Sequence, residues 1–127
     1  MLPFMASGRI VRDYGVLFKY VELLEKRGRG YEARRALPTS EDIEYLKRAV
    51  TRGMVRTLDE AIKLLKSRFR ERIDVDVAAE AYRRHYGVAD VSEDMAVEEL
   101  SRVLAGYAIE IAEQLGEIRL RNLELLR

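Results

Sequence analysis

The stretch that decides the fold is SEDMAVEELSRVLAGYAIEIAEQLGEIRLRNLELLR, which runs from Ser92 to Arg127. Every seventh residue in it is apolar, and these residues are Val97, Leu104, Ile111, Ile118 and Leu125. A repeat of this kind places an apolar stripe along one face of a helix. No proline interrupts the segment, and Ser92 offers an N-cap oxygen just ahead of it. The sequence therefore predicts one long C-terminal helix over residues 93–126.

The length of this helix suggests a contact with another chain. A helix over residues 93–126 would span roughly 50 Å, whereas a domain of this size is about 30 Å across. The companion positions, Leu100, Tyr107, Gln114 and Arg121, lose their apolar character along the helix. The first half, Val97 to Leu115, is therefore expected to pack within its own domain, and the last turns to face a partner. We expect a homo-oligomer whose interface uses Leu104, Ile111, Ile118 and Leu125.

Apolar periodicity and capping residues predict the remaining helices. Apolar residues recur at helical spacing over residues 8–27, and glycines follow that segment. Thr39 or Ser40 caps a helix that Gly53 closes, and Thr57 and Glu60 form a capping box for the next helix. A shorter helix follows and ends at Tyr86. The fold class expected is all-α, with about five helices in a bundle or orthogonal array, in a single domain over residues 1–127.

Residues 31–37, YEARRAL, are ambiguous on their own. Their composition favours helix, but only seven residues separate Gly30 from Pro38, which makes a short and marginal helix. A helical turn or loop is the favoured interpretation, and a short strand is the alternative.

The composition indicates a globular protein. Hydrophobic residues make up 48% of the 127 residues and charged residues 35%, which excludes a disordered chain. No apolar run reaches the ~20 residues of a membrane span, no secretory signal is visible, and cysteine is absent, so a cytoplasmic location is expected. The single asparagine and glutamine, beside many charged residues, are typical of a thermophile.

The charge is divided unequally along the chain. Residues 1–72 hold 17 Lys and Arg against 10 Asp and Glu, a net charge of +7. Residues 73–127 hold 6 against 12, a net charge of −6, so the two parts recover the overall +1. A basic half is typical of proteins that face nucleic acid. An equally open interpretation is that the basic half docks on the acidic half, within or between subunits.

The residue pattern argues against an enzyme. His85 is the only histidine and cysteine is absent, which excludes a multi-histidine zinc site and a cysteine nucleophile. Neither a P-loop nor a Gly-x-Ser-x-Gly turn is present. Glu110, Glu113 and Glu117 share one helix face, but a solvated acidic face has the same spacing as a metal site. We expect no catalytic residue, no cofactor, no metal ion and no small-molecule substrate.

The run LPTSEDIEYLKRAVTRGMVRTLDEAIKLLKSRF, residues 37–69, carries a partial resemblance to a known family. Pro38 opens a helix, Gly53 closes it, and the residues after the turn are Val55, Thr57, Glu60, Ala61 and Ile62. This pattern resembles the ribbon-helix-helix family of DNA-binding regulators. The resemblance implies two intertwined chains that insert a two-stranded ribbon, built just before Pro38, into the major groove. It also implies that the start of the second helix, at Thr57, Leu58 and Asp59, lies near a DNA phosphate.

Two functions follow as hypotheses. The first is a small DNA-binding protein, such as a transcriptional regulator, that binds duplex DNA through the basic hairpin 41–72 and dimerises through its C-terminal helix. Its predicted DNA-binding residues are Arg52, Arg56, Thr57, Lys63, Lys66 and Arg70. The alternative is a non-enzymatic structural or adaptor protein that assembles through amphipathic helix faces.

Overall fold

The computed structural model describes residues 10–120, which form six α-helices and no strand. The helices are α1 (Gly15–Lys26), α2 (Gly30–Arg35), α3 (Ser40–Thr51), α4 (Leu58–Arg70), α5 (Val75–Tyr86) and α6 (Glu93–Gln114). The all-α prediction is confirmed, and the count exceeds the expected five because the ambiguous segment after Gly30 is a helix of its own. No helix among these residues is long and apolar enough to cross a membrane.

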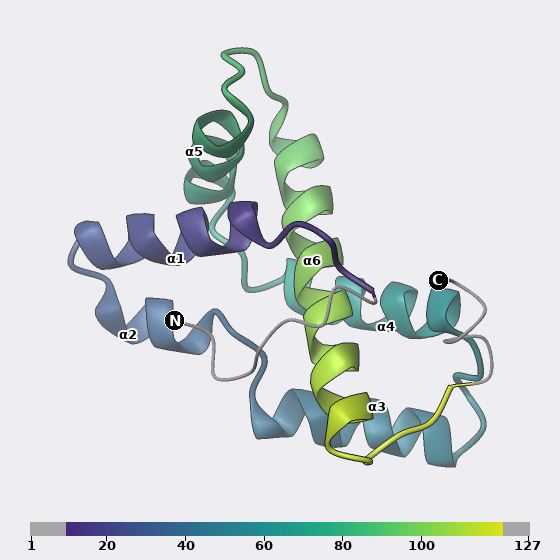
Figure 1. Ribbon diagram of the computed structural model, residues 1–127. Coiled ribbons are helices and arrows are strands. Elements are labelled where there is room, and N and C mark those ends of the chain that lie inside the picture. Colours follow the sequence, from purple (N-terminus) through teal and green to yellow (C-terminus); the bar gives the residue numbers. More distant parts are fainter. Residues whose placement is uncertain (1–9, 121–127) are drawn as a thin grey trace.

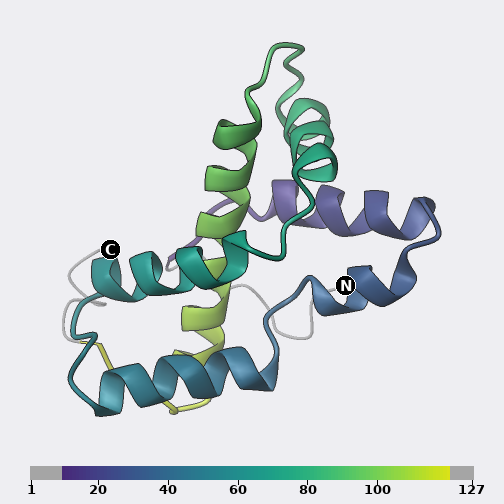
Figure 2. The same cartoon turned by 180° about the vertical axis from the view of Figure 1, so that it is seen from behind.

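Helix α6 is the centre of the molecule. Four helices surround it: α5 lies along its N-terminal half, while α1, α3 and α4 cross it, with α4 making the most extensive contact (Figures 1 and 2), and α2 packs on α1. Almost every α6 residue from Ala96 to Ala112 is buried, on all sides of the helix. A helix enclosed in this way needs small side chains where neighbours come close, and α6 supplies alanines, Ser101 and Gly106.

The C-terminal helix is shorter than the sequence pattern predicts. It ends at Gln114 instead of 126, because Gly116 adopts the left-handed conformation with φ of 72°. The Glu117 N–H donates to the Ala112 carbonyl at 2.9 Å, and the Gly116 N–H donates to Glu113 at 3.1 Å. These two bonds form the Schellman motif that closes many helices. Leu125, which was assigned to the interface, lies outside the described residues.

The first helix begins later than expected, at Gly15 instead of Gly8. The Asp13 carboxylate accepts a hydrogen bond from the Gly15 N–H at 2.8 Å, which favours a turn before the helix. Residues 10–14 are not helical and cross α6 at Gly106, where a Cβ atom would lie 2.3 Å from Val11 Cγ2. The backbone of Gly15 lies against the imidazole of His85 in α5, where a Cβ atom would come 1.8 Å from the ring.

The segment over residues 31–37 contains no strand. Residues Gly30–Arg35 form α2, and the side chain of Ala33 is buried against the core. This segment therefore does not supply the ribbon that the ribbon-helix-helix resemblance implies. The resemblance rests on the α3–α4 pair alone.

The capping residues predicted for α3, α4 and α6 stand where the sequence places them. Thr39 begins α3 and Thr57 begins α4, each through a reciprocal capping box. Asp74 caps α5 and Ser92 caps α6, each by accepting a hydrogen bond from a backbone N–H three residues ahead. Gly53 and Gly87 follow their helices with positive φ. These local signals fix the boundaries of α3, α4 and α5, and the start of α6.

We predict that Gly106→Ala destabilises the fold by about 1–3 kcal/mol, because the added methyl group overlaps the Val11 side chain. Urea unfolding measures the change. Gly30→Ala is the matched control, since its Cβ would meet only Arg34 Nη1 at an ordinary 3.7 Å. Equal stability of the two variants would show that residues 10–14 do not press on α6.

Candidate nucleic-acid interface

The turn between α3 and α4 is built by a second Schellman motif. Gly53 adopts φ of 74°, its N–H donates to Val50, and the Met54 N–H donates to the Ala49 carbonyl at 3.0 Å. In this motif the residue after the glycine packs against the helix residue that accepts its hydrogen bond. Met54 is thereby placed beside Ala49, although its side chain remains 66% exposed. Val55 follows it and is buried, which anchors the turn to the core.

A small pocket lies beside this turn. Its volume is about 210 Å³, and its lining consists of Tyr45, Arg48, Ala49, Arg52, Met54 and Leu64. Five of these residues come from α3 and its turn, while Leu64 comes from α4. Arg48 and Arg52 are four residues apart, so both lie on the same side of α3. The pocket therefore has an apolar and aromatic lining with two exposed guanidinium groups beside it.

Three arginines around this turn are not engaged in ion pairs. Within residues 10–120, none of Arg48, Arg52 and Arg56 has a carboxylate within ion-pair distance, and all three are exposed. A Cβ atom on Gly53 would lie 3.8 Å from Arg56 Nη2, so this guanidinium also lies over the turn. We call Arg48, Arg52, Met54 and Arg56 the hairpin tip. It combines positive charge with an exposed apolar side chain.

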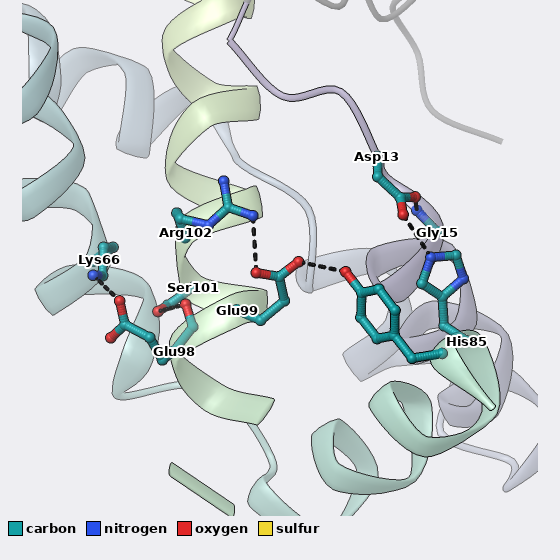
Figure 3. A network of polar contacts seen from close by, with 9 residues as sticks. Asp13, Gly15, Lys66, His85, Glu98, Glu99, Ser101 and Arg102 are labelled. Carbon is teal, nitrogen blue, oxygen red and sulfur yellow. Dashed lines mark hydrogen bonds and ion pairs between the residues drawn. The ribbon is translucent and has the colours of Figure 1, made fainter. Parts of the chain in front are cut away.

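The other predicted DNA-binding residues have different surroundings. Lys66 forms an ion pair with Glu98 of α6, and Arg70 binds the same carboxylate at 2.9 Å (Figure 3 shows the Lys66 contact). The hydrogen bond from Lys66 lowers the pKa of Glu98. The Thr57 hydroxyl is used by the α4 capping box, while Lys63 is exposed. Of the predicted set, only Arg52 and Arg56 belong to the hairpin tip.

A buried carboxylate holds α3 and α4 together. Asp42 of α3 is fully buried; its carboxylate accepts from Arg68 Nε at 2.8 Å and from Arg72 Nη2 at 2.6 Å. The Thr39 N–H adds a third hydrogen bond at 2.7 Å. Burial alone raises the pKa of the Asp42 carboxyl, but the bonds from Arg72, Thr39 and Arg68 outweigh it and lower the pKa to about 2. Arg68 also stacks on the Tyr45 ring, with its guanidinium carbon 4.3 Å from the ring centre.

The described residues that were predicted for an oligomer interface are buried in the core of the subunit. The side chains of Leu104, Ile111 and Ile118 are 1%, 5% and 7% exposed, respectively. They are buried because α6 is enclosed by other helices of the same chain. A side chain buried in this way offers no surface to a second chain, so an interface between copies would have to use other residues.

The two oppositely charged parts of the chain meet within the subunit. Five ion pairs join residues 10–72 to residues 73–120, and they are Arg27–Glu80, Arg29–Asp74, Lys47–Glu117, Lys66–Glu98 and Arg70–Glu98. His85 adds a contact with Asp13, whose carboxylate lies 2.8 Å from the ring (Figure 3), and this hydrogen bond lowers the pKa of Asp13. Some charges of the basic part are therefore neutralised by carboxylates of the acidic part within the same subunit.

Glu110, Glu113 and Glu117 do not form one solvated acidic face, since α6 ends before Glu117. Glu110 is only 4% exposed; the Tyr14 hydroxyl and the Val11 N–H both donate hydrogen bonds to its carboxylate. Burial and this bond raise the pKa of the Tyr14 hydroxyl. Glu117 pairs with Lys47 at 2.8 Å. In the part of the chain that the structure describes, no group of three His, Asp or Glu side chains is arranged to hold a metal ion.

Sequence reasoning missed Tyr45, Arg48 and Met54. The signal was present in the pattern itself, because a glycine at the end of a helix predicts contact between the next residue and the last turn. That rule places Met54 against Ala49, and the spacing of Arg48 and Arg52 then puts both arginines beside it.

Comparisons with protein-family models, curated proteins and solved structures found no match for this chain.

We predict that Asp42→Asn lowers the stability by roughly 2–4 kcal/mol at pH 7, because Arg68 and Arg72 lose their shared anion. The folded pKa of about 2 lies below the ordinary 3.8. The contribution of Asp42 is therefore fully present above pH 3.8 and is lost as the pH falls through about 2. Urea unfolding at a series of pH values measures both effects.

The control for this experiment is Asp59→Asn, which changes an exposed carboxylate at the start of α4. It should change the stability by less than about 1 kcal/mol. If Asp42→Asn retains the acid dependence of the wild type, the carboxylate does not stabilise the hairpin as described.

Proposed function

We propose that the protein binds nucleic acid, with duplex DNA as the expected partner, through the hairpin tip. The observation that carries the proposal is the group of three exposed arginines, Arg48, Arg52 and Arg56, that have no ion pair within residues 10–120. Most other cations of the basic half are already paired, with residues 73–120 or with carboxylates nearby. The hairpin tip is thus a place where three available positive charges gather around one turn.

The geometry of the hairpin supports this choice. Arginine binds phosphate well because its planar guanidinium presents several N–H donors to the oxygens. The Schellman turn and the buried Asp42 fix the backbone that carries these arginines, with Arg48 in α3, Arg52 at its C-cap and Arg56 in the turn before α4. Fixed cations lose less conformational entropy on binding than cations on a loose loop. Binding would be driven by release of counterions, and it would fall steeply with salt.

The proposal does not include a dimer interface on α6, because the apolar residues predicted for it are buried within the subunit. The expected affinity of a single tip is that of non-specific binding, in the range of about 10⁻⁴–10⁻⁶ M.

We predict that changing Arg48, Arg52 and Arg56 together to glutamine strongly weakens binding to a labelled duplex at about 50 mM salt. Fluorescence anisotropy gives the dissociation constant, and a salt titration gives its dependence on ionic strength. If all three arginines meet phosphates, the slope of log K against log salt should fall in magnitude by about 2–3.

The matched control changes three arginines elsewhere, Arg12, Arg34 and Arg119, which are exposed and have no ion pair within the described residues. This variant has the same net charge as the first one. Equal losses in both variants would mean that overall charge, rather than the hairpin tip, drives binding. A wild-type protein that binds no duplex at about 50 mM salt would overturn the proposal and favour the alternative of a protein adaptor.

A further inference from the structure

The pocket beside the hairpin tip is the right size for a single planar group. Its volume of about 210 Å³ is below the about 300 Å³ at which sites for drug-sized molecules begin. It is also several times the about 30 Å³ that one water molecule occupies in the liquid. Met54, Ala49 and Leu64 give it apolar walls, and Tyr45 adds an aromatic ring.

Resting on the proposed function, we propose that this pocket receives one unpaired nucleobase, whose flanking phosphates bind Arg48 and Arg52. The partner is then single-stranded nucleic acid, or a duplex with a single-stranded end. The apolar and aromatic walls suit the face of a base, and the arginines beside the pocket suit the phosphates on either side of it. Stacking on side chains together with a basic surface is the general chemistry of single-strand binding.

The charge at the pocket favours a nucleotide over an apolar side chain of a protein. Arg48 and Arg52 both line the pocket and are exposed, and neither has a carboxylate partner among residues 10–120. An apolar group alone would leave these two charges unneutralised at its edge. A base carries a phosphate on each side, so one ligand fills the pocket and neutralises both arginines.

The lining is held in place before any ligand binds. Arg68 lies over the Tyr45 ring and is fixed in turn by the buried Asp42. The hydrogen bond from the Met54 N–H to the Ala49 carbonyl sets the position of Met54. Because these groups come from the folded hairpin, the pocket requires no rearrangement to accept a base.

A base within a duplex is not available to this pocket. It is stacked and paired, and removing it from the helix costs a few kcal/mol. A base in a single-stranded overhang avoids that cost. The proposal therefore requires the overhang to bind more tightly than the blunt duplex.

The experiment compares three labelled DNAs by fluorescence anisotropy at constant salt. They are a blunt duplex, the same duplex with a short single-stranded overhang, and that overhang with abasic sites in place of its bases. The overhang should bind about tenfold more tightly than the blunt duplex, as expected for stacking of one base. The abasic overhang keeps the phosphates and should lose that gain.

Met54→Ala tests the wall of the pocket, and Met95→Ala is its matched control. Both methionines are exposed, at 66% and 49%, but Met95 lies on α6 away from the hairpin tip. Met54→Ala should weaken binding of the overhang several-fold more than it weakens binding of the blunt duplex. Met95→Ala should change neither.

The outcomes separate this inference from the proposed function. Equal binding of the blunt, overhanging and abasic DNAs overturns the base pocket but leaves nucleic-acid binding at the hairpin tip intact. The same holds if Met54→Ala weakens all three DNAs equally. Failure of the wild type to bind any of the three overturns both proposals.

Discussion

Burial of α6 on every side is the constraint on which the rest of the structure depends. A helix enclosed by its own chain can tolerate few polar groups, and each one needs a partner. Glu110 receives hydrogen bonds from Tyr14 and Val11, so the non-helical segment before α1 is tied to the central helix. Gly106 lets that segment come close. The position of α1, and through His85 that of α5, therefore depends on this contact.

The boundaries of α3 and the starts of α4 and α6 were predictable because they are set by neighbouring residues. Thr39, Thr57, Asp74 and Ser92 each cap the helix that follows, and Gly53 closes α3 as its sequence position indicates. Such signals act over three or four residues and need no knowledge of the tertiary fold. The all-α class follows from them together with the apolar periodicity.

Features set by tertiary contacts were not predictable in the same way. Gly116 closes α6 by the same local signal as Gly53, but the heptad repeat that continues to Ile118 masked it; the burial of Ile118 after that turn is what tertiary contacts decide. Glu110 has the spacing of a surface residue, and only the approach of Tyr14 and Val11 makes it buried. For the candidate site, Arg52 and Arg56 were found from charge, whereas Tyr45, Arg48 and Met54 required the geometry of the turn.

Charge pairing explains why the hairpin tip differs from the rest of the basic half. Lys66 and Arg70 point toward α6, whose Glu98 neutralises both, and Asp42 holds Arg68 and Arg72 between the two helices. These pairs all lie toward the core, where packing brings carboxylates within reach. The C-terminal end of α3 projects beyond that packing, so its arginines meet no carboxylate of residues 10–120. The same contacts that stabilise the hairpin thus concentrate its available positive charge at the turn.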